Sequence, residues 1–233
     1  MLRIADLNAF YGRAHILFDL AIEVAKGEVI ALLGRNGAGK STTLKSIIGL
    51  VRPASGEIRF RGQPISGLAP YAISRLGLGY VPEERRVFDE LTVMENLEVG
   101  RQTPRTDAPT WTPERLFALF PNLAEMRTRR GGSMSGGEQQ MLTIARTLMG
   151  NPALILLDEP SEGLAPVIVE QMARTVCALK AEGLTVVLSE QNLHFAQMVA
   201  DRGYVIEKGR ICYHGTMAEL AADEEVRATY LTV

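Results

Sequence analysis

The segment from residue 34 to residue 41 carries the strongest chemical signal in this chain. Its residues, Gly-Arg-Asn-Gly-Ala-Gly-Lys-Ser, fit the phosphate-binding pattern G-x-x-x-x-G-K-[ST]. The glycines let backbone N–H groups turn inward around an anion, and a helix that begins here adds its partial positive charge. We expect Lys40 to reach the β- and γ-phosphates of a nucleotide, and the Ser41 hydroxyl to ligate Mg²⁺.

The neighbouring sequence supplies the elements that must position this loop. Residues 29–33 are continuously apolar and predict a buried strand, and residues 42–50 predict a helix that ends near Gly49. A strand, a glycine loop and a helix in this order make a chance glycine-rich turn the weaker interpretation. The predicted nucleotide-binding residues of the loop are Gly34, Arg35, Asn36, Gly37, Ala38, Gly39, Lys40, Ser41 and Thr42.

Two carboxylates follow a second apolar run, at residues 154–157. In a phosphate-loop protein the first of them, Asp158, would hold Mg²⁺ through its water shell. The next, Glu159, would lie beyond the strand end and polarise an attacking water. An acidic turn after a strand is common by itself, but the phosphate-loop pattern on the same chain favours the catalytic interpretation.

A third motif begins at Ser135. Ser135 and Glu138 have the spacing of a capping box, which predicts a helix start followed by an apolar face. Gly136 and Gly137 leave backbone N–H groups uncovered at this positive helix end, which is a second phosphate site. Since one nucleotide needs only one phosphate loop, we predict that this turn serves the nucleotide of another subunit.

The composition bounds what the protein can be. The chain has 233 residues, 46% of them hydrophobic, and a formal net charge of −2, which gives no electrostatic footprint for nucleic acid. Cys177 and Cys212 lack metal-ligand spacing, and we expect both to be reduced thiols in the core of a cytosolic protein. No signal peptide and no apolar run near the ~20 residues that cross a bilayer are present, so a membrane role would come through a partner.

Apolar strands alternate with helices along much of the chain. Strands are predicted at residues 56–62, 185–188 and 203–206, and an amphipathic helix at residues 166–181. This alternation predicts an α/β fold with a parallel sheet covered on both faces. Residues 84–150 are polar and helical in pattern, and we interpret them as an insertion.

The three motifs together resemble those of the ATP-binding cassette ATPases, the motor subunits of ABC transporters. The likeness covers essentially the whole chain. Residues 34–41 match the Walker A motif, residues 154–159 match Walker B, and residues 134–139 stand where the family has Leu-Ser-Gly-Gly-Gln. Tyr11 stands where the family keeps an aromatic residue that stacks on adenine.

The resemblance also implies the domain organisation. We expect a single domain over residues 1–233, with a phosphate-loop (RecA-like) parallel-sheet core, a small antiparallel β region and a helical subdomain insertion. The nucleotide-binding core would span about residues 1–83 and 151–233, and the helical signature subdomain about residues 84–150.

Further segments resemble the ATPases of branched-chain amino-acid importers. These segments are residues 80–88, 91–97, 135–142, 158–166 and 189–192. They also occur, with small changes, in importers of urea and short-chain amides.

Three positions depart from the wider family. Glu83 replaces the Q-loop glutamine, Ala165 replaces the D-loop aspartate, and Gln191 replaces the switch histidine. By position we expect Glu83 to join Ser41 and Asp158 near Mg²⁺. We expect Gln191 to contact the γ-phosphate or the attacking water through its amide, because an amide donates and accepts hydrogen bonds without titrating. His194, three residues later, is expected on a helix surface.

The resemblance implies an ATPase that binds MgATP between two cassettes arranged head to tail. Residues 135–137 of each chain would face the γ-phosphate held by the other chain's Lys40, with Glu159 and Gln191 acting in turnover. The second cassette would be a copy or a relative, and the pair would drive integral-membrane permease subunits from the cytoplasmic face of the membrane. The alternatives are a non-transport cassette protein, for which the chain lacks a second cassette or a long coiled coil, and an ATP sensor without turnover, which Glu159 disfavours.

Overall fold

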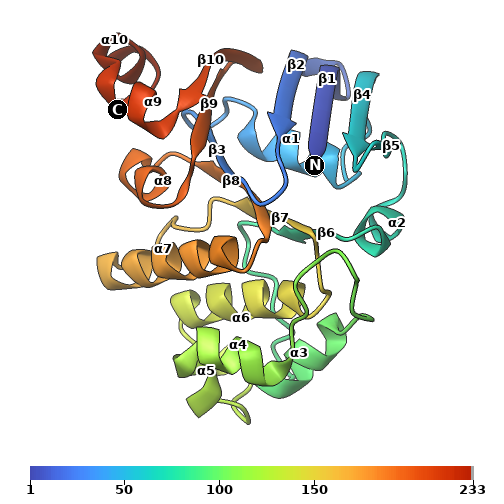
Figure 1. The fold of residues 1–233 in the computed structure, drawn as a ribbon, viewed down its shortest axis with the longest axis vertical. Coiled ribbons are helices and arrows are strands. Elements are labelled where there is room, and N and C mark those ends of the chain that lie inside the picture. Colours follow the sequence, from blue (N-terminus) through green and yellow to red (C-terminus); the bar gives the residue numbers. More distant parts are fainter. Residues whose placement is uncertain (232–233) are drawn as a thin grey trace.

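A six-stranded sheet forms the centre of the protein, whose computed structural model describes residues 1–231 (Figure 1). Its strand order is β10-β9-β3-β8-β7-β6, and every neighbouring pair is parallel except the edge pair β9 and β10. The strands are β3 (Val29–Leu33), β6 (Leu78–Val81), β7 (Leu154–Asp158), β8 (Thr185–Glu190), β9 (Arg202–Glu207) and β10 (Arg210–Thr216). The predicted parallel sheet is confirmed, and β8 runs two residues further than the sequence indicated.

The register of this sheet gathers the chemically interesting residues at one edge. Leu33 at the end of β3 is opposite Glu190 of β8, and Asp158 at the end of β7 is opposite Ser189. Because the strands are parallel, the segments that follow β3, β7 and β8 leave the sheet at the same edge. In open α/β sheets this carboxyl edge is where ligands bind.

A second sheet is antiparallel, with the order β2-β1-β4-β5. Its strands are β1 (Leu2–Tyr11), β2 (Ala14–Val24), β4 (Ser55–Phe60) and β5 (Gln63–Pro64), and β1 joins β2 through a turn at Gly12 and Arg13. The inner side chains of this sheet share one apolar cluster with Ile30 and Leu32 of β3 and with α1 (Lys40–Ile47). The predicted small antiparallel region is therefore confirmed as a layer over one face of the central sheet.

Helices cover the opposite face of the central sheet. Val29, Ala31 and Leu33 alternate with the residues that face α1, and they join a cluster with α6 (Gly136–Leu148), α7 (Pro166–Ala181) and α8 (Leu193–Val199). The predicted bounds of α7 are confirmed. The observed α1 begins at Lys40, two residues before the predicted start.

Residues 84–150 contain α3 (Val93–Gly100), α4 (Pro113–Leu119), α5 (Pro121–Glu125), the 3₁₀ turn η1 (Gly131–Ser133) and α6. These helices lie together below α7 in Figure 1, with α3 packed on α6. Capping explains where they begin: the Thr92 side chain accepts from the Glu95 amide, and the Glu95 carboxylate accepts from the Thr92 amide. The remaining helices are α2 (Pro70–Arg75), α9 (Met217–Ala222), α10 (Glu224–Val226) and the π-helical turn η2 (Arg227–Leu231).

One prediction about the core is wrong. Cys177 and Cys212 are both exposed free thiols. Cys177 lies on α7 outside the buried row of Met172, Val176 and Leu179, and Cys212 lies on the edge strand β10. Apolar neighbours in sequence misled the prediction, because helix and strand periodicity place adjacent residues on different faces.

None of the helices within residues 1–231 has the length and apolar character required to cross a membrane.

Candidate functional site

The phosphate loop connects β3 to α1 with glycines in conformations that other residues rarely adopt. Gly37 has a φ of 77° and Gly39 a φ of 113°, and a Cβ on Gly39 would lie 2.9 Å from Leu17 Cδ2. Gly39 is also the residue that precedes the first turn of α1, and no side chain caps that turn. The first backbone N–H groups of α1 therefore have no competing side-chain acceptor at their capping position, which suits an incoming anion.

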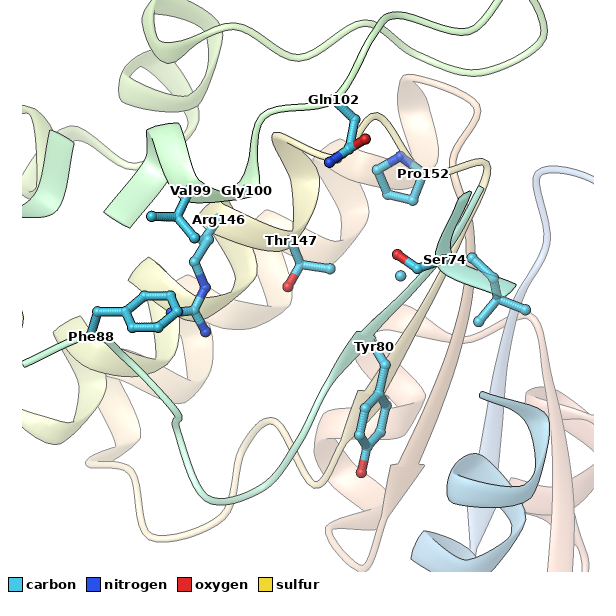
Figure 2. A pocket seen from close by; sticks show the side chains of 12 residues that line it. Ser74, Tyr80, Phe88, Val99, Gly100, Gln102, Arg146, Thr147 and Pro152 are labelled. Carbon is cyan, nitrogen blue, oxygen red and sulfur yellow. The ribbon is translucent and has the colours of Figure 1, made fainter. Parts of the chain in front are cut away.

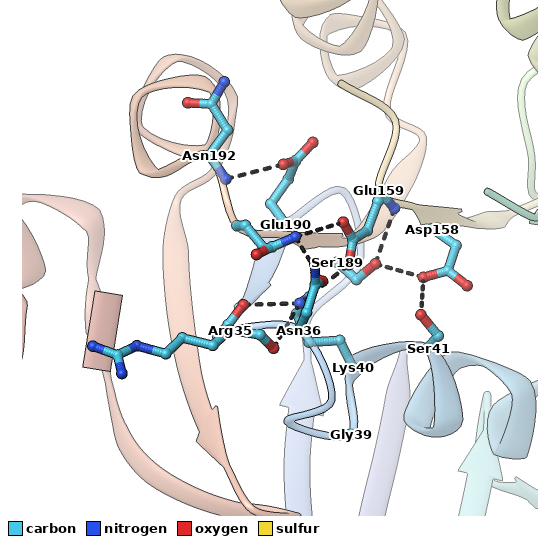
Figure 3. A network of polar contacts seen from close by, with 12 residues as sticks. Arg35, Asn36, Gly39, Lys40, Ser41, Asp158, Glu159, Ser189, Glu190 and Asn192 are labelled. Atoms are coloured by element: carbon cyan, nitrogen blue, oxygen red, sulfur yellow. Dashed lines mark hydrogen bonds and ion pairs between the residues drawn. The ribbon is translucent and has the colours of Figure 1, made fainter. Parts of the chain in front are cut away.

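Lys40 is the buried cation of this loop. It is 3% exposed, and its Nζ donates to the carbonyl oxygens of Gly34 at 2.8 Å and Arg35 at 3.1 Å. The same ammonium lies 3.1 Å from Glu159 Oε1. Figure 3 shows these groups between the loop and the strand ends. A charge this deeply buried requires such partners, and phosphate oxygens would serve equally well.

Asp158 accepts three hydroxyl hydrogen bonds. Ser41 Oγ and Ser189 Oγ donate to Oδ1 at 2.9 and 2.7 Å, and the Tyr80 hydroxyl donates to Oδ2 at 3.0 Å. Burial, followed by the adjacent Asp158 charge, raises the pKa of Tyr80, so that the phenol remains a donor. Tyr80 and Ser189 were not predicted as site residues. They follow from the pairing of β7 with β6 and β8, which motif spacing does not reveal.

The oxygen donors fit the predicted Mg²⁺ when the ion arrives with a nucleotide. Ser41 and Asp158 are in direct contact, and Glu83 lines the same hollow. Burial, followed by the negative charges of Glu159 and Asp158, raises the pKa of Glu83, and a cation here would relieve that repulsion. Within residues 1–231 no cluster of three or more His, Cys, Asp or Glu side chains can hold a metal by itself. Mg²⁺ commonly binds one or two carboxylates and completes its shell with phosphate and water.

Glu159 is the first residue beyond β7 and has a φ of 46°. Its amide donates to Ser189 Oγ at 3.0 Å, and its Oε2 accepts from Gln191 Nε2 at 3.2 Å. Burial opposes ionisation, but a hydrogen bond from Glu162 and the charge of Lys40 together lower the pKa of Glu159. Glu159 is therefore a carboxylate at neutral pH, with the protonation state that a general base requires.

Gln191 lies where the sequence predicted, at the edge shared by β7 and β8. Besides Glu159, its Nε2 donates to Asn36 Oδ1 of the phosphate loop at 2.7 Å. Its side chain thus connects the loop to Glu159. His194 is exposed on α8 and does not line this hollow, as expected for a helix-surface residue.

Two further glutamates belong to the site and were assigned no role from the sequence. Glu190 is 2% exposed, and its carboxylate accepts from the Ser161 amide at 3.0 Å and the Asn192 amide at 3.2 Å. It thereby shapes the turns after β7 and β8. Glu162 shares a hydrogen bond with Glu159, which together with burial raises the pKa of Glu162 to about 7.

These groups surround a hollow of about 420 Å³. Its lining residues are Tyr11, Ile16, Asn36, Gly37, Gly39, Lys40, Ser41, Thr42, Glu83, Glu159 and Glu162. Tyr11 is 50% exposed at the end of β1, so its ring is open to a ligand. Most of the predicted nucleotide-binding loop thus meets the predicted Glu159 and Glu83 in one place.

The predicted residues of the third motif lie elsewhere. Ser135, Gly136 and Gly137 do not line the hollow, and α6 packs on the opposite face of the central sheet from α1. The predicted capping box is confirmed: Ser135 Oγ accepts from the Glu138 amide at 3.4 Å, and Glu138 Oε2 accepts from the Ser135 amide at 2.7 Å. This box does not use the amides of Gly136 and Gly137, which are half-buried behind the exposed Ser135.

A buried lysine in a glycine loop, beside carboxylates at two strand ends, defines a phosphate-loop nucleotide-binding protein. Residues 17–162 match the ABC transporter family, and the chain belongs to that family as an ATP-binding cassette. It is 47% identical to BraG of Pseudomonas aeruginosa, a high-affinity branched-chain amino acid transport ATP-binding protein, and the match covers 99% of each chain.

Two other relatives and one crystal structure extend the comparison. LivF of Archaeoglobus fulgidus, a probable branched-chain amino acid transport ATP-binding protein, is 37% identical, with 97% of this chain and 96% of LivF covered. LptB of Acidithiobacillus ferridurans, a lipopolysaccharide export system ATP-binding protein, is 35% identical, with 99% and 96% covered. The ADP conformation of MJ1267, an ATP-binding cassette of an ABC transporter, superposes with a TM-score of 0.82 at 28% identity, covering 98% of this chain and 97% of MJ1267.

Proposed function

We propose that this chain hydrolyses MgATP and thereby drives an ABC importer of branched-chain amino acids. The contact between the buried Glu159 carboxylate and Lys40 supports the proposed ATP hydrolysis, because it places a base beside the cation expected to hold the terminal phosphates. The likeness to BraG over the full length of both chains supports the solute class.

Binding begins with an exchange of partners at Lys40. In the structure its ammonium contacts the Gly34 and Arg35 carbonyl oxygens and Glu159. The β- and γ-phosphates would replace these acceptors, and the backbone amides at the start of α1 would hold the remaining phosphate oxygens. Tyr11 would stack on adenine, which adds affinity without acting on the chemical step.

Glu159 would then polarise the attacking water. Release from Lys40 leaves its carboxylate free to accept a hydrogen bond from water, while the Gln191 amide holds the other carboxylate oxygen. Because an amide does not titrate, this orientation is retained across the physiological pH range. Ser41 and Asp158, with Glu83 nearby, would hold Mg²⁺, which would neutralise negative charge on the phosphates when bound.

Residues 135–137 would act on a different nucleotide. Their exposed helix start is separated from the hollow of the same chain, so we assign them to the γ-phosphate bound by a facing cassette. The two cassettes would close head to tail around ATP and separate after hydrolysis. The facing cassette would be a second copy of this chain or a related one.

A groove between the helical part and the sheet is the proposed contact for the permease. It has a volume of about 380 Å³ and includes Tyr80 of β6, Val99 at the end of α3 and Arg146 of α6 (Figure 2). Phe88 is 47% exposed at its rim, with the Arg146 guanidinium 4.9 Å from its ring centroid. Since the Tyr80 hydroxyl bonds Asp158, a permease helix in this groove would contact a residue of the nucleotide site directly.

Membrane association and uptake test the transport part. An affinity-tagged chain should co-purify permease subunits from solubilised membranes, and Phe88→Ser should weaken this recovery without reducing ATP binding. Cells that depend on this chain should take up labelled leucine, isoleucine or valine, and Glu159→Gln should abolish uptake. Normal branched-chain uptake in cells that lack the chain would disprove the solute assignment.

Lipopolysaccharide export is a second candidate, favoured by the 35% identity to LptB across nearly the whole chain. It predicts an envelope defect on depletion, with unchanged amino-acid uptake. An importer of urea or short-chain amides predicts loss of labelled urea or amide uptake instead.

A further inference from the structure

Arg85 lies between the turn after β7 and the start of α6. Its Nη2 donates to the carbonyl oxygen of Glu162, in the turn after β7, at 2.7 Å. On its other side the guanidinium lies against the start of α6, where a Cβ on Gly136 would overlap Nη1. A Cβ on Gly163 would also lie 3.4 Å from Nη2. Arg85 therefore fills the space between the Ser135 turn and the turn that follows Glu159.

The backbone holds this arginine in an uncommon conformation. Arg85 has a φ of 48°, in the left-handed region that residues other than glycine seldom occupy. Its carbonyl oxygen accepts from the Val87 amide at 2.7 Å, which closes a tight turn. Left-handed residues of this kind are concentrated at functional sites, where the surrounding structure maintains them.

Arg85 places a positive charge beside a helix start where the Ser135 amide already donates to the Glu138 carboxylate. The start of the 13-residue helix α6 carries a partial positive charge, which disfavours a second cation and favours an anion. A guanidinium also presents five N–H donors, and the Glu162 carbonyl satisfies one of them. A phosphate group, with several oxygens and negative charge, matches both the remaining donors and the helix start.

We propose that Arg85 is a phosphate-binding residue of the shared site, contacting the terminal phosphate of the nucleotide bound by the facing cassette. This inference rests on the proposed head-to-tail dimer. Arg85 does not line the hollow around Lys40, so its phosphate is that of the facing chain and not of its own. Because the contact is made to the γ-phosphate, Arg85 favours closure around ATP over closure around ADP. Through its hydrogen bond to Glu162, Arg85 would connect the γ-phosphate of the facing chain to the turn that carries Glu159.

Dimer formation in a Glu159→Gln background tests the proposal. Arg85→Gln in that background should weaken MgATP-dependent dimer association about 10–100-fold, the effect of losing one charge-assisted hydrogen bond. Arg85→Lys should recover most of the loss, since it keeps the charge. Nucleotide affinity of the dilute monomer, measured with a fluorescent ATP analogue, should stay within about twofold of the parent, because Arg85 bonds only the backbone of Glu162 and no residue that lines the hollow is replaced.

Arg86→Gln is the matched control. Arg86 is the next residue, and its exposed guanidinium lies 3.4 Å from Glu84. Its loss should leave dimer association at the parent value. Raising the salt concentration should weaken the parent dimer more than the Arg85→Gln dimer, because one ionic contact is already absent from the latter.

The possible results distinguish a failure of the Arg85 assignment from a failure of the proposed head-to-tail dimer. If the Glu159→Gln parent stays monomeric with MgATP, the head-to-tail dimer of this chain is disproved, and the role of Arg85 with it. If the parent dimerises and Arg85→Gln dimerises equally well, only the Arg85 assignment is wrong. A loss of association that Arg85→Lys does not restore would assign Arg85 a structural role and overturn phosphate binding.

Discussion

The edge of the central sheet and the start of α6 are the two regions proposed to bind phosphate, and they differ in how their polar groups are satisfied. At the sheet edge, Lys40, Asp158 and Glu159 are between 1% and 7% exposed, and each polar group has partners from other segments. At the start of α6, Ser135 is exposed and its bonds go to Glu138 in its own capping box.

This difference separates the functions of the two regions. The sheet edge is pre-organised within one chain, because buried charges must be paired before any ligand arrives. At the α6 start Ser135 is exposed, Gly136 and Gly137 are half-buried, and the capping box does not use the two glycine amides, so a partner could supply an anion there. The sheet edge would therefore bind nucleotide within one chain, and the start of α6 would contact a nucleotide that the facing chain binds.

The largest effect should follow replacement of Glu159, the proposed general base at the sheet edge. Glu159→Gln should lower ATP turnover by about 10²–10⁴-fold, because an amide cannot accept a proton from water. ATP binding should persist, since Lys40 and the loop are unchanged. Steady-state phosphate release from the purified protein measures this, and near-normal turnover would contradict the role of Glu159.

Lys40→Ala should weaken ATP binding by about 10–100-fold, because it removes the buried cation that faces the phosphates. It also leaves Glu159 buried without its ion-pair partner. Calorimetric titration with ATP gives the affinity. Lys45→Ala on the same helix is the control, because Lys45 does not line the hollow, and it should bind ATP normally.

Gln191→Ala should lower turnover about tenfold with little change in ATP affinity, since it removes the amide that orients Glu159. His194→Ala is its control and should leave both quantities unchanged. If His194→Ala abolished turnover and Gln191→Ala did not, the histidine would hold the switch role.

The smallest effect concerns Glu162. Its pKa in the folded state, about 7, is above its ordinary value of 4.5, so the folded protein holds this proton more tightly than the unfolded chain. The stability that this proton gives is present below pH 4.5 and is lost as the pH rises through 7. Glu162→Gln should therefore raise the Tm, by a few degrees at most, at pH 8, and should change it little at pH 5. Thermal scans at both pH values measure this, and an equal shift at both would contradict the titration of Glu162.

Much of the sheet edge could be predicted because local motifs specify it. The strand before Gly34 has the predicted bounds, and the helix that begins at Lys40 and the strand that ends at Asp158 lie within three residues of theirs. Parallel strands then bring their carboxyl ends together, so the proximity of Gln191 and Glu159 followed from topology.

The parts that escaped prediction depend on contacts between distant segments. The Tyr80 and Ser189 hydroxyls reach Asp158 across neighbouring strands, and Glu190 reaches the Ser161 amide across a turn. No local spacing encodes these contacts. The exposed Cys177 shows the same limit for the core, because its apolar neighbours face a different direction.

The molar mass of the Glu159→Gln protein, measured by light scattering with MgATP and with MgADP, tests the central comparison most directly. The mass should double with MgATP and not with MgADP. Adding Ser135→Arg should prevent the doubling while the chain still binds ATP, because the larger cationic side chain crowds the shared phosphate site. A Ser135→Arg protein that still doubles its mass with MgATP would contradict the assignment of the α6 start to the facing nucleotide.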